Sequence, residues 1–442
     1  MAGAPLTSGS GNTGSGSSPG SLSQGQGFIL SMLASLFFMW GFLSVLQDIL
    51  VPHLRAIFDL NYFQSMLVQF FWFGAYFVMS MPMAFLLQRI GYQKSLVTGL
   101  VMMAVGALLL VVAGRIANFE AHLVALFILA SGVALLQVAA NPYVAVIGPD
   151  SSAPARLNLV QAMNSTGSAL APLFGAWLIL ARTTAGTAEA DAVLTEAEKL
   201  ADARSVELPY IGIAILLLIL AVVFSRLKLP DLGAGTRRVA KEERKKLSLW
   251  KHRNLVWGVP AIFMYLICEI GVGALFINLI TSPHITGMTR AEAGGVPLFS
   301  LWFAMAIGRF AGAWLMTRIA AEKLLAGCAL GGFLLLLYVS VGTGPVVMYT
   351  LILVGLCHSI MFPTIFTLAI RGLGPLTEEG SGLLIMAIAG GALATLQGRL
   401  ADSYGLQISF LYPAICELFV LWYALWGSKV TNPEPPEKLE SA

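Results

Sequence analysis

The chain has 442 residues, of which 57% are hydrophobic and only 11% are charged, and its mean hydropathy is +0.80. Soluble proteins carry about 25% charged residues, so this composition excludes a soluble globular protein. The net charge of +3 indicates no class of partner, and no basic stretch interleaved with aromatic residues predicts nucleic-acid binding. The composition is typical of an all-α membrane protein with many spans.

Apolar runs of about 20 residues, enough for a helix to cross about 30 Å of hydrocarbon, recur along the chain. They predict twelve transmembrane helices, at residues 28–51, 62–87, 93–113, 121–146, 157–180, 208–227, 254–280, 294–316, 322–341, 346–370, 380–400 and 406–427. Residues 1–27 are rich in Gly and Ser and predict a flexible N-terminal tail, and residues 429–442 form a C-terminal tail.

The basic stretch 228–253 divides the predicted spans six and six. We therefore expect residues 28–227 and 254–428 to form two six-helix bundles joined by a cytoplasmic basic linker. For the charged run 237–246 we favour a solvated amphipathic helix over a specific site for anionic lipid.

Lys and Arg residues predict the orientation of the spans, because cytoplasmic loops carry an excess of them. With both termini cytoplasmic, sixteen basic residues lie in or beside the inward-facing loops, against seven on the opposite side. This distribution predicts a multi-pass protein whose two termini are cytoplasmic.

Three short segments recur after an interval of six spans, which indicates an internal repeat. The aligned pairs are AFLLQRIGYQK (84–94) with AWLMTRIAAEK (313–323), SALAPLFG (168–175) with GALATLQG (391–398), and Pro142 with Pro363. An even number of spans per repeat gives two pseudo-symmetric halves of the same orientation. This pattern resembles the architecture of major facilitator transporters, in which the substrate binds between the halves and the halves rock to expose it alternately.

The first aligned pair also resembles a short basic loop motif of that superfamily, Gly-x-x-x-Asp-Arg-x-Gly-Arg-Lys. Here the first Gly and the Asp are replaced, whereas Arg89, Gly91 and Lys94 remain. The resemblance implies a latch at the cytoplasmic gate, to which Arg318 contributes as the counterpart of Arg89. An ordinary positively charged cytoplasmic loop is the alternative.

Four ionisable side chains lie within predicted spans: Asp48, Glu269, Arg309 and Glu417. Each costs at least about 2.5 kcal/mol at the bilayer centre unless it is paired or lines water. Asp48 and Glu269 are 221 residues apart, the same offset as the proline pair, so the repeat places one carboxylate in each half. Two acids facing a central cavity suit coupling to a co-transported cation, either H⁺ or Na⁺.

Each of these four residues has a second interpretation. Asp48 is late in its span and would then pair with Arg55 at the outer surface, and Glu269 would form a structural hydrogen bond to a neighbouring span. We expect Glu417 to be peripheral and structural. We expect Arg309 to be the partner of an acid near the cytoplasmic gate rather than a substrate ligand.

Neutral hydrogen-bonding side chains also gather at membrane depth: Gln137 and Asn141 in the fourth span, Gln161 and Asn164 in the fifth, and Asn278 and Gln397 in the second half. Spacings of three and four place each of the first two pairs on one helix face. Amides both donate and accept, as sugar hydroxyls do. The pattern predicts an uncharged ligand with many hydroxyls, onto which Trp40, Tyr76, Tyr265 or Trp302 would stack. His358 is either a proton relay or a core histidine.

Enzymatic chemistry has no support in the sequence, which lacks a nucleotide-binding loop, metal-ligand spacing and a plausible Ser/His/Asp set. The four cysteines lie in apolar runs without a CxxC pair, and we interpret them as packing residues. We therefore expect no enzymatic activity, no metal and no cofactor.

Several long segments carry a resemblance to a known family: QDILVPHL (47–54), LNYFQSMLVQFFWFGAY (60–76), QVAANPYVAVIGPD (137–150), RLNLVQAMNSTG (156–167), IMFPTIFTLAIRGLG (360–374) and GGALATLQG (390–398). They resemble the fucose–galactose–glucose:cation symporters, a branch of the major facilitator superfamily, over residues 28–428. Within that family the chain is most similar to bacterial glucose/galactose transporters.

The resemblance implies uptake of a neutral monosaccharide across a bacterial inner membrane by a protein that is a monomer surrounded by lipid. It implies that Asp48 binds sugar and couples the cation, with Gln161 and Asn164 nearby. Gln47 replaces the usual Asn before this Asp. Fucose, N-acetylglucosamine, fructose and a disaccharide stay open as substrates.

Two further positions depart from the fucose permeases. Gln137 stands where they have a Glu, and Glu269 stands where they have a Gln. The second carboxylate has therefore moved to the other half of the chain. An exporter of the same fold is a weaker alternative, because the many amides do not suit an apolar cavity. A transport-like sensor would need a signalling domain, for which the two tails offer no room.

Overall fold

The computed structural model describes residues 24–57, 62–116, 118–178, 207–227, 229–230 and 248–430, with side chains except at 24–26, 46–66, 172–178 and 290–291. These residues form helices and no strand. The first half contains α1 (Gln24–Ile57), α2 (Tyr62–Arg115), α3 (Phe119–Val146), the short η1 (Asp150–Ser152), α4 (Ala153–Leu178) and α7 (Glu207–Arg226).

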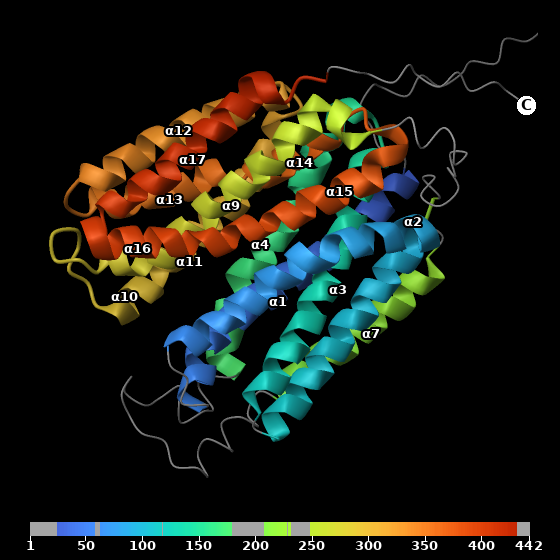
Figure 1. Ribbon diagram of the computed structural model, residues 1–442, viewed down its shortest axis with the longest axis horizontal. Helices are drawn as coiled ribbons and strands as arrows, with labels where there is room; N and C mark the ends of the chain where they lie inside the picture. The colour runs from blue at the N-terminus through green and yellow to red at the C-terminus, as the bar shows by residue number, and fades with distance from the viewer. Residues whose placement is uncertain are drawn as a thin grey trace, which may run out of the picture.

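The second half is built from shorter pieces. Its α-helices are α9 (Arg253–Ile280), α10 (Arg290–Gly294), α11 (Val296–Leu315), α12 (Ala321–Val341), α13 (Val346–His358), α14 (Met361–Ile370), α15 (Thr377–Met386), α16 (Ala394–Tyr404) and α17 (Leu411–Trp422). Between them lie η3 (Leu249–Lys251), η4 (Gly374–Leu376), η5 (Ala387–Leu393), η6 (Ile408–Phe410) and the π-helical η7 (Tyr423–Gly427). Figure 1 shows the halves as two groups of helices, with α4 between them.

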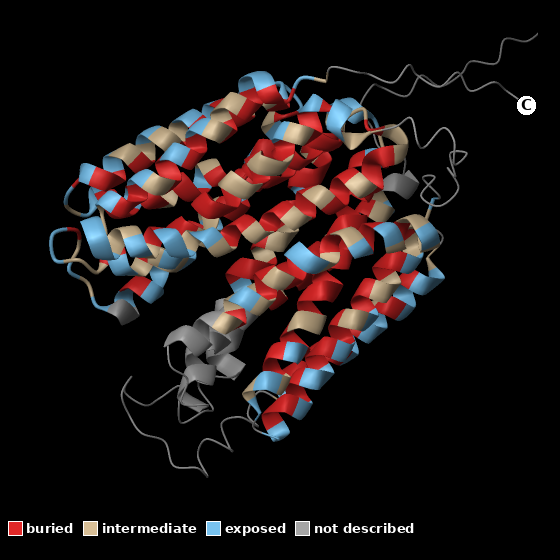
Figure 2. Cartoon of the chain, viewed as in Figure 1, coloured by how far each residue is buried: buried red, intermediate tan, exposed pale blue. Residues whose placement is uncertain are grey.

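Ten of the described helical segments are long and apolar enough to cross a membrane. One of them, within α2, contains both the second and the third predicted span, and the polar α4 supplies the fifth, so helices occupy all twelve predicted positions. Figure 2 shows much of the exposed surface on the outer faces of the helices. The large apolar side chains that are exposed include Phe70, Phe77, Val112, Ile215, Val222, Leu334, Tyr349 and Ile415. So much exposed apolar surface suits lipid rather than water.

The second and third spans join directly at Gly91, where the backbone of α2 bends. Gly91 has φ 80° and ψ 170°, a conformation that is essentially restricted to glycine. The glycine retained from the basic loop motif therefore makes the turn between two antiparallel spans.

The halves meet along two pairs of helices. The first pair is α4 with α11, with α14 alongside, and the second is α2 with α15 and η5. The six-span repeat relates α2 to α11 and α4 to the eleventh span, so these two contacts are counterparts. Away from them, α1 packs against α4, and α16 packs against α9 of its own half.

The repeat-related prolines explain one of these contacts. A proline has no N–H, so it leaves the carbonyl four residues earlier without its helical partner. Pro142 lies within α3 and frees the carbonyl of Val138. That carbonyl accepts a hydrogen bond from the Ser381 hydroxyl of the other half, at 3.0 Å.

Pro363 has the same effect in the second half, where the tenth span is broken. The span divides between α13, which ends at His358, and α14, which begins at Met361. The carbonyl of Ser359, four residues before Pro363, accepts from Nε of Arg309 at 2.9 Å.

The predicted domain boundaries fall close to helix ends in the structure. Helix α1 begins at Gln24, four residues before the predicted start of the first span, and α9 begins at Arg253. Residues 1–23, the run 237–246 and residues 431–442 lie outside the described residues. The tails and the amphipathic linker helix stay predictions.

Candidate functional site

Asp48 and Gln47, the central residues of the predicted site, lie on α1, but their side chains are outside the described residues. The same holds for Arg55, the alternative partner of Asp48. The roles of Asp48 and Gln47 stay predictions.

Three predicted sugar-binding residues form a buried group, which we name the amide cluster: Gln137, Asn141 and Gln161. Nε2 of Gln161 donates to Oδ1 of Asn141 at 3.4 Å, and Nε2 of Gln137 donates to the hydroxyl of Tyr76 at 2.9 Å. Nδ2 of Asn141 is buried and has no hydrogen-bond partner in the described part of the chain. The cluster therefore contains one donor that no described residue uses.

Asn164 connects α4 to α1 rather than to the amide cluster. Its Nδ2 donates to the carbonyl of Phe37 at 3.0 Å. A Cβ at Gly41 would lie 2.3 Å from the carbonyl oxygen of Asn164, so glycine is needed for this close approach. The helix that carries Asp48 is thereby held against the helix that carries Gln161.

Arg309 on α11 confirms the expectation that this buried cation pairs with an acid. Its Nη2 lies 4.0 Å from Oε1 of Glu269 on α9, and both side chains are largely buried. Its Nη1 donates across the interface to the carbonyl of Gln161, at 3.0 Å, and to the hydroxyl of Ser165. We name this set of contacts, with the bond to Ser359, the Arg309 bridge.

Among the other predicted ligand residues, Tyr76 is bonded to Gln137 of the amide cluster, whereas Asn278 is not bonded to the cluster by any described contact. Asn278 is exposed near the end of α9, and no described hydrogen bond links its side chain to the amide cluster. Tyr76 belongs to the buried core beside Gln137, and Trp302 packs over Gly273.

The predicted gate residues Arg89, Lys94 and Arg318 are exposed. The guanidinium of Arg318, in the turn after α11, lies 4.2 Å from the centroid of the Trp314 ring on that helix. The contacts between the halves come instead from neighbours of Arg89 that sequence reasoning missed.

Two side chains of the basic loop motif bond to the start of α15. Nε2 of Gln88 donates to Glu379 at 3.2 Å, and the hydroxyl of Tyr92 donates to Glu378 at 3.4 Å. The two adjacent acids of TEEG (377–380) are the signal in the sequence that would have indicated these contacts, because they make an acidic segment opposite a basic loop.

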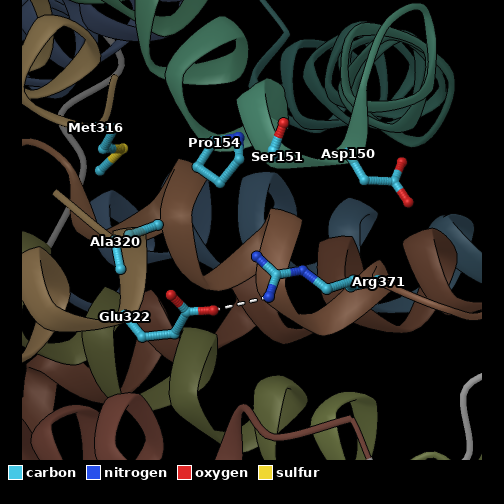
Figure 3. Close-up of a pocket in the computed structure, with 8 residues that line it drawn as sticks. Asp150, Ser151, Pro154, Met316, Ala320, Glu322 and Arg371 are labelled. Carbon is cyan, nitrogen blue, oxygen red and sulfur yellow. Dashed lines mark hydrogen bonds and ion pairs between the residues drawn. The ribbon is translucent and has the colours of Figure 1, made fainter. Parts of the chain in front are cut away.

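A hollow of about 400 Å³ lies at the same end of the interface. Figure 3 shows Arg371 and Glu322 pointing toward one another on one wall, with Asp150 and Pro154 on the other. The Arg371 guanidinium lies 2.7 Å from Glu322. None of the predicted sugar-binding residues whose side chains are described lines this hollow.

Glu417 is fully buried, so the expectation that it is peripheral is wrong. Its carboxylate lies 2.7 Å from Nε2 of His358 on α13, a helix that packs, as α17 does, against α12 and α9. Sequence reasoning missed this pair because helix packing, not sequence spacing, brings the two residues together. The four cysteines are free thiols.

Comparison with known proteins identifies the family. The sequence model of the Major Facilitator Superfamily matches residues 28–395. The chain belongs to the Major Facilitator Superfamily. This facilitator is 43% identical over 404 residues to the "Glucose/galactose transporter" of Brucella abortus biovar 1 (strain 9-941), covering 91% of this chain and 95% of that protein.

Two further similarities concern fucose transport. The facilitator is 34% identical over 411 residues to the "L-fucose-proton symporter" of Escherichia coli (strain K12), covering 91% of this chain and 93% of that protein. The crystal structure of the transporter FucP "in the outward conformation" matches it with a TM-score of 0.83 at 33% identity, covering 92% of this chain and 100% of that one. The resemblance read from the sequence and the two-half helical fold are thereby confirmed.

Proposed function

We propose that this facilitator imports a neutral monosaccharide, with glucose or galactose the first candidates, together with a cation. The amide cluster carries the proposal. It is buried, uncharged and rich in both donors and acceptors, and Nδ2 of Asn141 has no hydrogen-bond partner among the described residues. Such a site suits hydroxyl groups and disfavours a charged ligand. The sugar named for the 43% identical relative supports the same substrate class.

A proton is the proposed coupling ion. Glu269 faces Arg309, and a carboxylate held by an arginine changes its interactions when it is protonated. A sodium site would instead gather several oxygen ligands around the ion. A proton is also the ion named for the 34% identical relative. Asp48 is the proposed sugar and coupling residue on the opposite half.

The arrangement of contacts supports alternating access. The described hydrogen bonds between the halves extend from the Arg309 bridge to the start of α15, where Gln88 bonds to Glu379 and Tyr92 bonds to Glu378. With both termini cytoplasmic, this end faces the cytoplasm, and the conformation is open toward the outside. Opening inward breaks the bond between Arg309 and Gln161, while Glu269 stays beside Arg309 on the same half.

A bacterial inner membrane is the proposed location, with both termini in the cytoplasm and a monomer as the functional unit. The apolar outer faces support contact with lipid. Labelling of single cysteines placed in each tail, in intact and in opened cells, tests the orientation.

Counterflow of labelled glucose in proteoliposomes tests the transport proposal. A panel of unlabelled galactose, fucose, fructose, N-acetylglucosamine and disaccharides should be run with and without a proton gradient, and with and without sodium. We expect glucose or galactose to compete and the proton gradient to drive accumulation. Absence of competition by every sugar would reject the substrate class, and accumulation driven by sodium alone would reject the proton.

A further inference from the structure

His358 and Glu417 form a buried acid–base pair that the proposed sugar site does not use. Nε2 of His358 lies 2.7 Å from Oε1 of Glu417, and the two side chains are 2% and 0% exposed. Their alignment falls outside hydrogen-bond geometry, so His358 Nε2 and both carboxylate oxygens have no hydrogen-bond partner in the described part of the chain. An ionised carboxylate in such a place is strongly disfavoured unless a cation or a proton accompanies it.

Among the described residues in contact with Glu417, none other than His358 can add a charge at pH 7. Helix α12 approaches through Gly332, where a Cβ would lie 3.3 Å from the carboxylate. The other titratable side chains that interact with Glu417 are Tyr265 and Cys268 of α9, Cys328 of α12, Cys357 of α13 and Cys416 of its own helix. Thiols and phenols stay neutral at pH 7. The charge of this pocket is therefore set by His358 and Glu417 alone.

The pair also lies at the break in the tenth span. The carbonyl of His358 accepts from the hydroxyl of Tyr265 at 3.2 Å, and the next carbonyl, of Ser359, accepts from Arg309. Arg309 in turn bonds to Gln161 of the other half. Discontinuous helices in transporters gather at substrate and ion sites because their freed backbone groups can rearrange. A change at the pair therefore acts on the same backbone segment that anchors the Arg309 bridge.

We propose that His358 and Glu417 are a proton-binding site of the transport cycle, in addition to Glu269 and Asp48. This inference rests on the proposed proton-coupled import of sugar. In the conformation described, the pair carries one proton, on either of its two members, and is closed to water. Loss of the proton to water leaves a net negative charge between α13 and α17. That charge favours movement of the broken span once the Arg309 bridge opens, and a new proton restores the neutral pair.

The experiment compares two transport modes in proteoliposomes that contain the full-length protein. Counterflow of labelled glucose needs no net movement of protons, whereas uphill glucose accumulation under an imposed proton gradient does. For Glu417→Gln and His358→Gln we expect counterflow within about twofold of the unmodified protein and accumulation reduced at least tenfold. Leu356→Met and Leu418→Met, at exposed neighbouring positions of the same helices, are the matched controls and should keep both activities.

Three outcomes would overturn the proposal. In the first, both Gln variants accumulate glucose as well as the unmodified protein does. In the second, both variants lose counterflow and accumulation equally. The third concerns folding, which is followed by thermal unfolding with and without glucose. The double variant His358→Gln/Glu417→Gln keeps a neutral pair of similar size, and if it and both single variants fail to fold, the pair is structural.

The same experiment separates this inference from the proposed function. If the unmodified protein shows no counterflow with glucose or any competing sugar, the substrate proposal fails first. If the unmodified protein transports glucose and the variants behave as it does, only the proton site at His358 and Glu417 is rejected.

Discussion

At the residue scale, the side chain of Asn141 carries a buried hydrogen-bond donor that no described residue uses. A buried N–H without a partner costs about 1–3 kcal/mol, a penalty that a ligand hydroxyl removes when it accepts the bond. Nδ2 of Asn141 is such a group, while its Oδ1 is already occupied by Gln161. The side chain is thus oriented by one contact and open for a second, which is the arrangement expected of a binding residue.

Replacing Asn141 by Leu should weaken sugar binding with little loss of fold. We expect the half-saturation concentration for glucose counterflow to rise about tenfold, the equivalent of about 1.4 kcal/mol. Thr350→Val is the matched control, because it also removes a buried polar group, but one that bonds only to its own helix at Val346. An unchanged half-saturation concentration in Asn141→Leu would remove this residue from the binding site.

Replacing Arg309 by Lys keeps the charge but loses the planar fork that reaches several partners. A single ammonium group cannot bond to Ser359, Gln161 and Ser165 together and remain beside Glu269. We expect proton-driven uptake to fall at least tenfold and the melting temperature to drop. The exposed Arg399, replaced by Lys, serves as the control and should change neither quantity.

The residues of the site could be predicted only in part from the sequence. The spacing within each span placed Gln137 with Asn141, and the cost of a buried charge predicted an acid beside Arg309. The pair of His358 and Glu417 could not be found this way. Its two members come from separate helices, and their contact depends on how α13 and α17 both pack against α12 and α9.

At the element scale, the two repeat-related prolines have different effects on their helices. Pro363 lies in the first turn of α14, where its missing N–H is tolerated and the span divides. Pro142 lies far along α3, which continues through it. In both cases a carbonyl is freed and then bonded by a side chain. The repeat predicted the pair, but the break itself depends on Arg309 being available to replace the lost bond.

Replacing Ser381 by Ala should loosen the contact between α15 and α3, because the carbonyl of Val138 then loses its donor. We expect faster labelling of a cysteine introduced at Ala84, which packs against Gly382 in this interface. Pro142→Ala restores a helical N–H to that carbonyl and should loosen the interface in the same way. Thr395→Val on α16, whose hydroxyl bonds only within its own helical segment, is the control. Equal labelling rates in all variants would contradict this account.

At the scale of the whole molecule, the two halves meet through contacts that the repeat makes equivalent, α2 with α15 and α11 with α4. The sequence predicted two similar halves from three aligned segments. It could not predict which helices meet, because that depends on how the halves dock. Of the aligned segments, AFLLQRIGYQK lies on α2, AWLMTRIAAEK begins on α11 and SALAPLFG lies on α4, whereas GALATLQG lies on η5 and α16 and the proline pair lies on α3 and α14.

Joining the halves at one end should stop transport without unfolding the protein. Cysteines at Gln88 and Glu379, whose side chains bond at 3.2 Å, would be joined by a short bifunctional thiosulfonate reagent. We expect counterflow to fall at least tenfold and to recover when a reducing agent cleaves the link. Each single-cysteine variant treated with the same reagent is the control. Full counterflow in the linked protein would show that this end need not open.

The polar character of α4 has a consequence for how the protein is made. Unlike the ten helical segments that could span a membrane by composition, this helix begins with Arg156, Asn158 and Gln161, which insert poorly as an isolated segment. We expect it to leave the translocon together with α3, whose carbonyl and amide oxygens accept hydrogen bonds from Arg156 and Gln161, whereas Asn158 meets its partner Thr364 only after the second half is made. The polar groups that α4 brings to the interface between the halves are thus obtained at the expense of independent membrane insertion.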